Sequence, residues 1–545
     1  QNRETITSNK QHLQNITSQS KEPEHDLTLT SHQQIAYDTI YQHFSNEENR
    51  PVLLHGITGS GKTEIYLHLI KKIIFKTTTS INNHSQALVM VPEIALTPQM
   101  TKAFERRFPG KVAVVHSAMN EQERWQELLN IHSGQKQILI GPRSAVFAPF
   151  KKLKLIVVDE EHDNSYKQQN KFFYHGRDAA IVRANIEGSS VILGSATPSL
   201  ESFWNAQTKK YHLVELNKRI SPYPLPSVLL TQCANKTRGE LVANQSTTTQ
   251  IKQQAPLDLL ISSEILDALK DNIQRKEQAI VVVNRRGYAH YLFDTANKKT
   301  IECPNCNISL TLHQAMSYLK CHYCLFETTM ETVLKTHPQA KLIAVGSGSQ
   351  KAESHLKQAL PQATIVRLDS DATTKKNHLQ DSLQKFAAGD IDILVGTQMI
   401  AKGHDFPKVT LVILLEVDHL LNIADFRAGE KTFQLLVQAS GRAGRDQLPG
   451  RVLIQTSNKE HFIITSAIQH HYHSFAEKEL SFRKVHQYPP FNRMIQVELS
   501  STNKSKIDYE GDHIRRWFDR LRKTSPSLFS TVKVLGPFAP SVEKL

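Results

Sequence analysis

The segment GITGSGKT has the residue types and spacing that suit the binding of phosphate groups. Glycines allow backbone amides to point inward around phosphate oxygens, a following lysine reaches the outer oxygens, and a neighbouring hydroxyl can hold Mg²⁺. An apolar run precedes the segment and a helical pattern follows it, so the start of the helix would add its positive end. The sequence therefore predicts a nucleotide-binding P-loop with these residues: Gly56, Gly59, Gly61, Lys62 and Thr63.

Acidic residues end a second apolar run further along the chain. The run LKLIVV leads directly into Asp159, Glu160, Glu161 and His162. A strand that ends in this way would place Asp159 near the Mg²⁺ and Glu160 where it can orient or deprotonate a water molecule. An acidic loop after a buried strand is the alternative, which the preceding P-loop disfavours. We therefore expect the two segments to hydrolyse a nucleoside triphosphate together.

Two further segments have residues that would couple this hydrolysis to another process. In VILGSATPSLES, Ser195 and Thr197 would hydrogen-bond the acidic motif and sense the γ-phosphate. In FQLLVQASGRAGR, the helical spacing of Gln438, Arg442 and Arg445 predicts one shared helix face. Arginines aimed at a γ-phosphate stabilise charge in the transition state. A strand-to-helix turn and a solvated basic helix are the respective structural alternatives.

A long loop between two predicted strands is another candidate for ligand binding. In open α/β sheets, ligands bind at the carboxyl ends of the strands. The loop would contact nucleotide on one side and a nucleic-acid backbone on the other. Its polar and small residues are Gly396, Thr397, Gln398, Lys402, Gly403 and Asp405.

Four of the five cysteines form two CxxC pairs. Such pairs form the two halves of a tetrahedral Cys₄ site, and four thiolates with no open position favour a structural Zn²⁺. His313 and His322 are nearby alternative ligands, whereas Cys233 stands alone. The predicted ligands of one zinc ion are Cys303, Cys306, Cys321 and Cys324.

The composition is that of a globular protein with an excess of positive charge. The net charge is +14 with a pI near 9.3, which favours polyanionic partners, although solubility is an alternative explanation. No apolar run approaches the roughly 18 residues that a membrane span needs. Five cysteines are too few for a disulfide framework, and the two CxxC pairs indicate a reducing compartment. Because the first residue is Gln, we expect a fragment or trimmed chain of an intracellular protein.

Short apolar runs alternate with helical patterns in two series, which predicts an α/β protein with doubly wound parallel sheets. The first series contains PVLLHG, ALVMVP, VAVVH, QILIG, LKLIVVDE and SVILGSA; the second contains AIVVVN, KLIAVG, TIVRLD, DILVGT, VTLVILLE and RVLIQT. The expected segments are a disordered tail or linker at 1–26, lobe 1 at 27–233, a linker at 234–256, lobe 2 at 257–470 with a zinc-binding insert at 300–335, and a small, truncated α+β domain at 471–545.

The order of these motifs resembles that of the superfamily 2 DExH helicases, which have two RecA-like lobes. More narrowly, VPEIALTPQM, GPRSAVFAPF, DEEHDNSYKQ, VVVNRRGYAH and RLDSDAT resemble segments of the PriA family of bacterial replication-restart helicases. The resemblance implies ATP-driven 3′-to-5′ unwinding at stalled or branched forks and assembly of a primosome. It also implies single-stranded and forked DNA, primosome proteins, single-strand-binding protein and a helicase loader as partners, in the cytoplasm at the nucleoid and without a membrane.

The resemblance also assigns roles to two segments near the P-loop and the acidic motif. Gln33 would contact the adenine of ATP, and SYKQQNKFFYHGRD is similar to an aromatic-rich loop that senses single-stranded DNA. Aromatic faces stack on bases while cations hold the backbone. Packing of the aromatic residues into the core is the alternative. The residues concerned are Tyr166, Lys167, Lys171, Phe172, Phe173, Tyr174 and Arg177.

The chain departs from the PriA pattern in three ways. The stretches that flank the zinc insert, YLFDTANKK and LKTHPQA, have no cysteine, so we expect one zinc ion where the family usually has two. The family's N-terminal domain, which binds DNA 3′ ends, is not recognisable, and the C-terminal domain is short. Two other functions stay open: a DNA translocase that does not separate strands, and a zinc-bearing primosome scaffold whose ATPase is dispensable.

Overall fold

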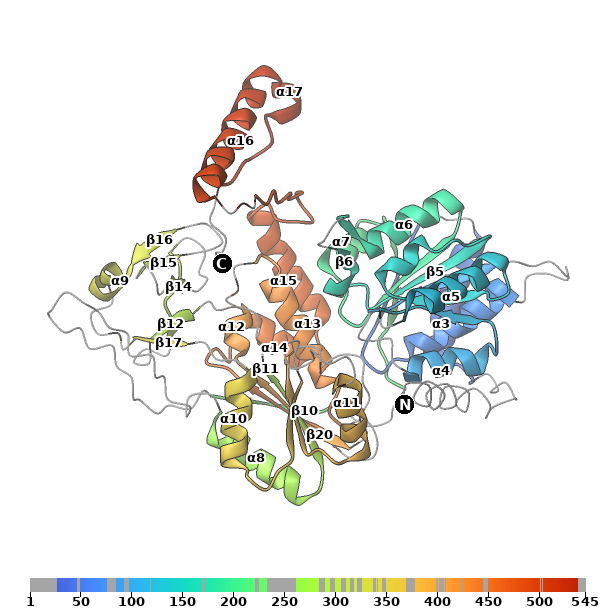
Figure 1. The fold of residues 1–545 in the computed structure, drawn as a ribbon, viewed down its shortest axis with the longest axis horizontal. Helices are drawn as coiled ribbons and strands as arrows, with labels where there is room; N and C mark the ends of the chain where they lie inside the picture. Colours follow the sequence, from blue (N-terminus) through green and yellow to red (C-terminus); the bar gives the residue numbers. More distant parts are fainter. Residues whose placement is uncertain are drawn as a thin grey trace, which may run out of the picture.

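The computed structural model contains two α/β lobes and a small β-rich insert (Figure 1). The described residues of lobe 1 lie within 27–216, those of lobe 2 within 227–231, 263–283 and 349–468, and those of the insert within 290–345. The expected tail at 1–26 and linker at 234–256 lie outside the described residues. The structure describes residues 27–46, 50–75, 85–92, 98–117, 119–168, 172–220, 225–232, 261–283, 290–294, 299–304, 310–313, 318–320, 326–336, 340, 342–345, 349–368, 378–397, 400, 406, 408–421, 423, 425–444, 449–499, 501 and 503–537.

Lobe 1 is built on a parallel sheet of seven strands in the order β3-β4-β2-β5-β8-β1-β9. The central strands are buried along most of their length because helices cover both faces of the sheet. The strands are β1 (Val52–Gly56), β2 (Gln86–Met90), β3 (Val112–Val114), β4 (Ile138–Gly141), β5 (Leu153–Asp159), β8 (Ser190–Ser195) and β9 (His212–Leu216). The helices are α2 (Ser31–Ser45), α3 (Lys62–Ile70), η1 (Lys71–Phe75), α4 (Pro98–Arg107), α5 (Glu121–Ser133), η3 (Arg143–Phe147), η4 (Asn164–Tyr166), α6 (Gly176–Glu187) and α7 (Leu200–Gln207).

Lobe 2 has a parallel sheet of six strands in the order β10-β21-β20-β11-β19-β18. The two parallel sheets confirm the predicted pair of doubly wound lobes. The strands are β10 (Ser227–Thr231), β11 (Gln278–Val283), β18 (Ile365–Leu368), β19 (Ile393–Gly396), β20 (Val409–Leu415) and β21 (Arg451–Gln455). The helices are α8 (Ser263–Gln274), α10 (Ser349–Ala359), α11 (His378–Ala388), α12 (Val417–Leu421), α13 (Ala428–Ser440) and α14 (Phe462–Ile468), followed by α15 (Tyr472–Val485).

The insert is an antiparallel sheet with its own small core. Its strands follow the order β13-β12-β14-β15-β16, and β17 also pairs with β12. Cys303 is fully buried in this core beside Leu312 and Leu319. The elements are β12 (His290–Asp294), β13 (Lys299–Thr300), β14 (Thr311–His313), β15 (Tyr318–Lys320), β16 (Glu327–Thr329), α9 (Met330–Thr336) and β17 (Leu342–Val345).

Three expected boundaries are wrong. β10 precedes the expected linker but pairs with β21, so the chain enters lobe 2 before residue 233. The run KLIAVG forms β17, which pairs antiparallel with β12 of the insert instead of joining the parallel sheet. The insert therefore extends beyond the expected range 300–335. α15 was expected in the C-terminal domain, but it packs into the core of lobe 2.

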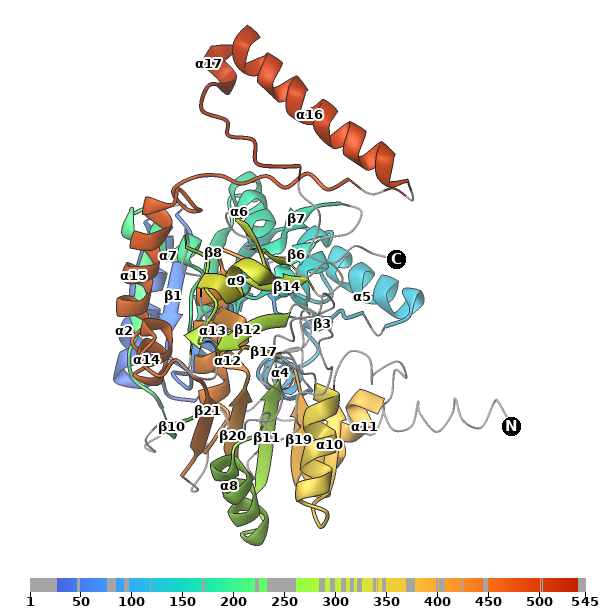
Figure 2. The ribbon, with the colours of Figure 1, turned by 90° about the vertical axis from the view of Figure 1, so that its left-hand side faces the viewer.

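Beyond α15, the regular elements in the described part of the chain are α16 (Lys504–Thr524) and α17 (Pro526–Phe529). They project away from both lobes (Figure 2). Among the described helices, none has the length and apolar character that crossing a membrane requires.

A continuous apolar core joins the lobes through α7 and α15, which lie beside each other (Figure 1). Phe203 of α7 is buried in the same cluster as Phe433 of α13 and Phe475 of α15. The ring of Tyr472 lies 5.1 Å from that of Phe203, and its hydroxyl donates a hydrogen bond to the carbonyl oxygen of Pro198 at 2.8 Å. These contacts fix the distance between the lobes at this face.

Buried charges reinforce the same face. Arg483 of α15 is fully buried and donates to Glu430 of α13 at 2.6 Å. The other oxygen of Glu430 accepts the backbone N–H of Leu200, the first residue of α7, at 3.0 Å. Glu201 and Glu479 lie within 3.7 Å and 3.5 Å of the same guanidinium. Burial and the charge of Glu430 oppose each other at Arg483, and the net effect raises the pKa of its guanidinium.

We predict that Arg483→Ala destabilises the contact between the lobes. The substitution leaves Glu430 buried without its cation, which costs roughly 3–5 kcal/mol for a buried ion pair. The urea concentration at which α7 and α15 lose protection from hydrogen exchange should fall.

Lys484→Ala is the matched control, because Lys484 is the exposed neighbour of Arg483 on the same helix. Equal midpoints for the two variants would show that the buried ion pairs do not hold the lobes together.

Candidate functional site

The P-loop joins β1 to α3 with the conformation that phosphate binding needs. Gly59 and Gly61 have φ values of 80° and 77°, which favour glycine. A Cβ at Gly61 would lie 2.3 Å from Ile220 and 2.4 Å from Gln33, so another residue there would displace these side chains and strain the backbone. Lys62 begins α3, and its ammonium donates to the carbonyl oxygen of Gly56 at 3.0 Å. Lysine and helix terminus therefore both face the loop, as predicted.

Groups around the loop fit a bound nucleotide with Mg²⁺. The hydroxyl of Ser60 is buried and has no hydrogen-bond partner among the described residues, and one carboxylate oxygen of Glu160 is in the same state. Buried polar atoms of this kind are costly unless a ligand or water satisfies them. Thr63 follows Lys62 in the first turn of α3. The donor set therefore suits phosphate oxygens and a hard cation.

Gln33 lies against the P-loop as part of its support. Its amide nitrogen donates to the carbonyl oxygens of Ser60 at 3.1 Å and Gly61 at 3.3 Å. Its amide oxygen accepts the backbone N–H of Thr30, which caps α2. The side chain is 3% exposed. Gln33 is thus beside the nucleotide loop, and the predicted contact with adenine stays a prediction.

Asp159 ends β5 next to the ends of β8 and β1, at one edge of the sheet. Tyr66 of α3 donates a hydrogen bond to its carboxylate at 3.0 Å, and Tyr166 donates to its carbonyl oxygen at 2.7 Å. Gly194 of β8 makes room for Tyr66, since a Cβ there would lie 1.7 Å from the tyrosine oxygen. The carboxylate is therefore held from the P-loop helix and from the following loop at once.

The surroundings of Asp159 also set its protonation. Burial and the nearby charge of Glu160 raise its pKa to about 6, while Lys62 and the Tyr66 hydroxyl act in the opposite direction. Burial and the charge of Asp159 raise the pKa of Tyr66 well above its usual value. Tyr66 therefore stays protonated as a donor, and Asp159 is ionised only above about pH 6.

Glu161 is fully buried and organises the loop after β5. Its carboxylate accepts the backbone N–H of Ser199 at 2.6 Å, the hydroxyl of Ser202 at 2.9 Å and the guanidinium of Arg177 at 2.9 Å. Glu160 adopts φ 46°, a left-handed conformation that non-glycine residues rarely take. The loop thus directs consecutive acids in different directions, with Glu161 inward and Glu160 partly exposed.

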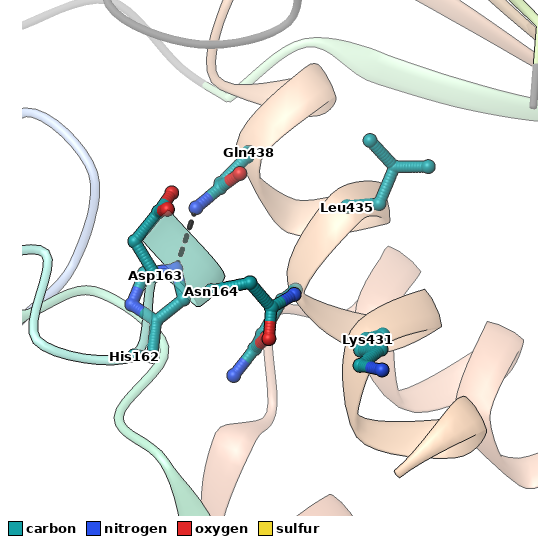
Figure 3. A pocket seen from close by; sticks show the side chains of 7 residues that line it. His162, Asp163, Asn164, Lys431, Leu435 and Gln438 are labelled. Carbon is teal, nitrogen blue, oxygen red and sulfur yellow. Dashed lines mark hydrogen bonds between the residues drawn. The ribbon is translucent and has the colours of Figure 1, made fainter. Parts of the chain in front are cut away.

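His162 connects the acidic motif to both β8 and lobe 2. Its Nδ1 lies 2.7 Å from the Ser195 hydroxyl, and its Nε2 accepts from the amide of Gln438 at 2.7 Å (Figure 3). With Gln438 donating to Nε2, the ring proton is on Nδ1 and goes to Ser195. The predicted link from Ser195 to the acidic motif is confirmed. Thr197 contributes only its backbone N–H to Ser195, and its hydroxyl makes no such bond.

A small cavity separates the loop after β5 from α13 (Figure 3). It is polar on both sides, because the loop contributes an imidazole, a carboxylate and an amide, while α13 contributes two amides and an ammonium. The lining residues are His162, Asp163, Asn164, Lys431, Gln434, Leu435 and Gln438.

The expected helical face of Gln438, Arg442 and Arg445 is wrong. α13 ends at Ser440, and Gly441 and Arg442 form a turn beyond it. Arg445 lies outside the described residues. The glycine allows close approach to the P-loop, since a Cβ at Gly441 would lie 2.5 Å from Thr58. Gly441, next to Arg442, therefore meets the nucleotide loop in a turn beyond the end of the helix.

The structure divides the predicted DNA-binding residues into two groups. Phe172 and Phe173 are 84% and 79% exposed on the loop between β6 (Lys167–Gln168) and β7 (Tyr174–His175). Tyr166 is fully buried, so its ring is not available for stacking on bases. Arg177 points inward to Glu161, so the prediction that it holds a DNA backbone is wrong. Lys171 lies outside the described residues.

Lys167 and Tyr174 are the remaining described residues of this predicted set. Lys167 is exposed, as a backbone contact requires, and Tyr174 is partly buried with its ring 5.1 Å from that of Phe147. Both remain candidates for contact with DNA.

The other predicted ligand-binding segments are described only in part. Gly396 ends β19, and a Cβ there would lie 2.3 Å from the carbonyl oxygen of Leu368. Thr397 follows it, whereas the remaining polar residues of this loop lie outside the described residues: Gln398, Lys402, Gly403 and Asp405.

The cysteine insert fits a structural zinc ion as far as it is described. Cys303 is buried at the edge of the insert core, next to β14 and β15, and four thiolates are the donor set that Zn²⁺ prefers. Beyond this first ligand, the predicted zinc residues lie outside the described residues: Cys306, Cys321 and Cys324, together with His322 and the isolated Cys233.

Sequence reasoning missed several residues that support the site. Tyr66 has the sequence signature of a core residue, and only its hydroxyl contact shows a second role. Arg219 lies beside the P-loop, since a Cβ at Gly59 would be 3.3 Å from its Nε. Ile220 covers the loop and donates its N–H to the carbonyl oxygen of Gly59 at 3.0 Å. Arg219 and Ile220 follow β9 and are far from the P-loop in the sequence. No local sequence pattern therefore connects them to it.

We predict that Mg²⁺-dependent nucleotide binding falls as the pH drops below about 6. The pKa of Asp159 is raised to about 6, so the carboxylate that Mg²⁺ needs is present above this pH and lost below it. Glu160→Gln removes a charge that raises this pKa and should move the midpoint to lower pH. Tyr66→Phe removes a hydrogen bond that lowers the pKa of Asp159 and should move the midpoint to higher pH.

The measurement is the affinity for a fluorescent ATP analogue with Mg²⁺ between pH 5 and pH 8, with Tyr37→Phe as the tyrosine control. Titration of the nucleotide itself is common to all the proteins and cancels. Midpoints that coincide in all four proteins would contradict this role of Asp159.

Three families match parts of the chain. The DEAD/DEAH box helicase family matches residues 30–203, and the helicase conserved C-terminal domain matches residues 324–447. The PriA DNA helicase Cys-rich region domain matches residues 303–328. The solved structure of RecG bound to a three-way DNA junction aligns with 89% of this chain and 50% of its own, with a TM-score of 0.47 and 16% identity.

Curated relatives match nearly the whole chain. Replication restart protein PriA of Bacillus subtilis (strain 168) is 38% identical over 95% of this chain and 61% of its own length. PriA of Haemophilus influenzae is 38% identical over 96% of this chain and 67% of its own, and that of Rickettsia felis is 35% identical over 92% and 72%. The chain spans 61% and 57% of the lengths of the Bacillus and Synechocystis relatives. The protein belongs to the replication restart protein PriA family.

Proposed function

We propose that this protein is an ATP-dependent DNA helicase, a motor that hydrolyses ATP between its lobes and moves along a DNA strand. The observation that carries the proposal is the connection from the P-loop through the acidic motif to lobe 2. Asp159 is bonded to Tyr66 of the P-loop helix, and His162, three residues later, is bonded to Gln438 of α13. A change at the nucleotide therefore reaches the other lobe through two hydrogen-bonded side chains.

The proposed roles follow the positions of the side chains. Gly56, Gly59, Gly61 and Lys62 hold the phosphates, and Thr63 and Asp159 hold Mg²⁺. When bound, Mg²⁺ neutralises charge on the phosphate oxygens. Glu160 orients or deprotonates the attacking water, for which its carboxylate is suited because one oxygen makes no hydrogen bond and lies 3.6 Å from His162 Nδ1. Arg442 and Arg445 act from lobe 2, where the adjacent Gly441 lies against Thr58 of the P-loop.

The coupling to DNA uses the exposed tip between β6 and β7. Phe172 and Phe173 offer aromatic faces to bases, and Lys167 offers charge to the backbone. Because Tyr166 at the base of this hairpin is bonded to the carbonyl oxygen of Asp159, movement of the tip would be felt at the Mg²⁺ ligand. DNA binding would thereby alter the rate of hydrolysis.

The finer assignment rests on family membership. We propose unwinding in the 3′-to-5′ direction at stalled or branched forks, followed by restart of replication through primosome assembly. The proposed partners are single-stranded and forked DNA, primosome proteins, single-strand-binding protein and a helicase loader, at the nucleoid in the cytoplasm. One zinc ion in the cysteine insert is proposed, because the flanking stretches lack the further cysteine pairs.

The test is ATP hydrolysis with and without single-stranded and forked DNA, followed by strand displacement on substrates with a 3′ or 5′ tail. Lys62→Ala should abolish hydrolysis, because the P-loop ammonium would contact the transferred phosphoryl group. Near-normal turnover in this variant would overturn the assignment. Hydrolysis stimulated by DNA without strand displacement would favour a translocase. Partner binding that survives Lys62→Ala, with no hydrolysis in the parent protein, would favour a scaffold.

We predict that replacing both Phe172 and Phe173 by Ala weakens the effect of DNA and leaves basal hydrolysis unchanged. Each base that stacks on an aromatic ring contributes about 1–3 kcal/mol, so the loss of even one stacked base should raise the DNA concentration for half-maximal stimulation by roughly 5- to 160-fold, and the loss of two should raise it further. The folded state should not change, because both rings are exposed.

Trp125→Ala is the matched control, since Trp125 is an exposed aromatic residue on a different element, α5. The same loss of stimulation in both proteins would show that the hairpin has no special role.

A further inference from the structure

Two histidines and a glutamate converge where β1 and β9 of lobe 1 meet α15. His55 is the last residue before Gly56 of the P-loop, Glu215 is on β9 and His473 is in the first turn of α15. His473 Nε2 lies 2.7 Å from Glu215 Oε1, and His55 Nδ1 lies 3.5 Å from the same oxygen. One nitrogen or oxygen of each residue falls within 4.8 Å of the others. Figure 2 shows α15 beside β1.

The three side chains form a site that is closed on one side and open on the other. The His55 side chain is 5% exposed, that of Glu215 is 31% exposed and that of His473 is 55% exposed. The aromatic ring of Tyr472 lies 4.8 Å from that of His55, and the ring of Phe203 lies 5.3 Å from that of His473. Aromatic walls thus surround the inner nitrogen, while the outer edge faces solvent.

A hydrogen-bonded pair of His473 and Glu215 explains only part of this arrangement. It leaves the buried His55 Nδ1 with a long contact of 3.5 Å to Glu215 Oε1, and no shorter hydrogen bond reaches this nitrogen within the described parts of the chain. Buried polar nitrogens are normally paired. An ion that accepts a lone pair from each of the three residues would satisfy His55 as well.

The chemistry of the three groups selects the class of ion. Two imidazoles and one carboxylate, with a fourth position left to water, are a donor set that Zn²⁺ accepts, and imidazole also suits Ni²⁺ and Cu²⁺. Ligand atoms around a tetrahedral zinc ion are about 3.3 Å apart, because each bond is about 2.0–2.1 Å long. The observed separations of 2.7 Å and 3.5 Å lie on either side of this value. The third separation, between His55 and His473, is at most 4.8 Å, and rotation of the exposed His473 side chain would shorten it.

We propose that His55, Glu215 and His473 form a binding site for a divalent transition-metal ion of the zinc class. The site is separate from the cysteine insert and uses residues of lobe 1 together with α15. A bound ion would tie α15 to the strand that leads into the P-loop, so it would oppose separation of the lobes at this face. The proposal is independent of the DNA-dependent activity proposed above, because it concerns metal binding alone.

The experiment measures zinc content and zinc-dependent stability of the full chain and three variants. His473→Ala and Glu215→Gln each remove one ligand, and His513→Ala removes an exposed histidine of α16 as the control. After equilibration with Zn²⁺ and gel filtration, the parent and His513→Ala should retain one more ion per chain than the two ligand variants. Any ion held by the cysteine insert is common to all four proteins and cancels.

Added Zn²⁺ should also raise the unfolding temperature of the parent and of His513→Ala, but not of the ligand variants. His473 is half exposed, so its variant should fold and can decide the question even if Glu215→Gln does not. Equal zinc content in the parent and His473→Ala would overturn the proposal. So would an equal thermal shift in these two proteins.

Discussion

A buried carboxylate needs hydrogen-bond donors or a cation in place of the water that it has lost. The carboxylate of Glu161 is fully buried, so the elements around it must supply these partners. Its partners come from two different elements, because Arg177 belongs to α6 while Ser199 and Ser202 belong to the start of α7. The loop after β5 is thereby fixed between these helices. Asp159, Glu160 and His162 take their directions from the same fixed loop.

The same requirement extends into lobe 2. Ser199, which pairs with Glu161, is followed by Leu200, whose backbone N–H pairs with the buried Glu430 of α13. Glu430 in turn needs the buried Arg483 of α15. One chain of paired charges and capped helix ends therefore runs from the acidic motif to the far side of the lobe interface. Breaking any link would leave a buried charge uncompensated, which is more costly than the pair is favourable.

Two kinds of contact between the lobes have different physical character. The contact at α7 and α15 combines a buried apolar cluster with buried ion pairs, which favours a permanent attachment. Between the loop after β5 and α13 it consists of single polar bonds, such as that of His162 to Gln438, beside a small cavity. Polar bonds of this kind exchange readily with water. A change in the relative position of the lobes would therefore occur at the polar contact while α15 acts as the fixed side.

The expected family and the expected folds of both lobes were correct because their signals are local. Buried parallel strands are continuous apolar runs, and the P-loop and the acids at the end of β5 are defined by spacing within single segments. Each of the predicted strands of lobe 1 is a strand in the structure, from PVLLHG to SVILGSA. The same local signal could not say which sheet KLIAVG would join, because an apolar run fits a parallel or an antiparallel neighbour.

The sequence by itself determined which segments could bind phosphate, Mg²⁺ and zinc, since these chemistries depend on residue types at short spacing. Tertiary structure alone decided which aromatic residues face solvent. Tyr166 and Phe172 are six positions apart in one motif, but one packs under β5 and the other is exposed. It also directed Arg177 to Glu161, and brought Tyr66 to Asp159 across 93 positions. These outcomes depend on partners far away in the chain, and the burial of a charge or a ring is decided only when those partners meet.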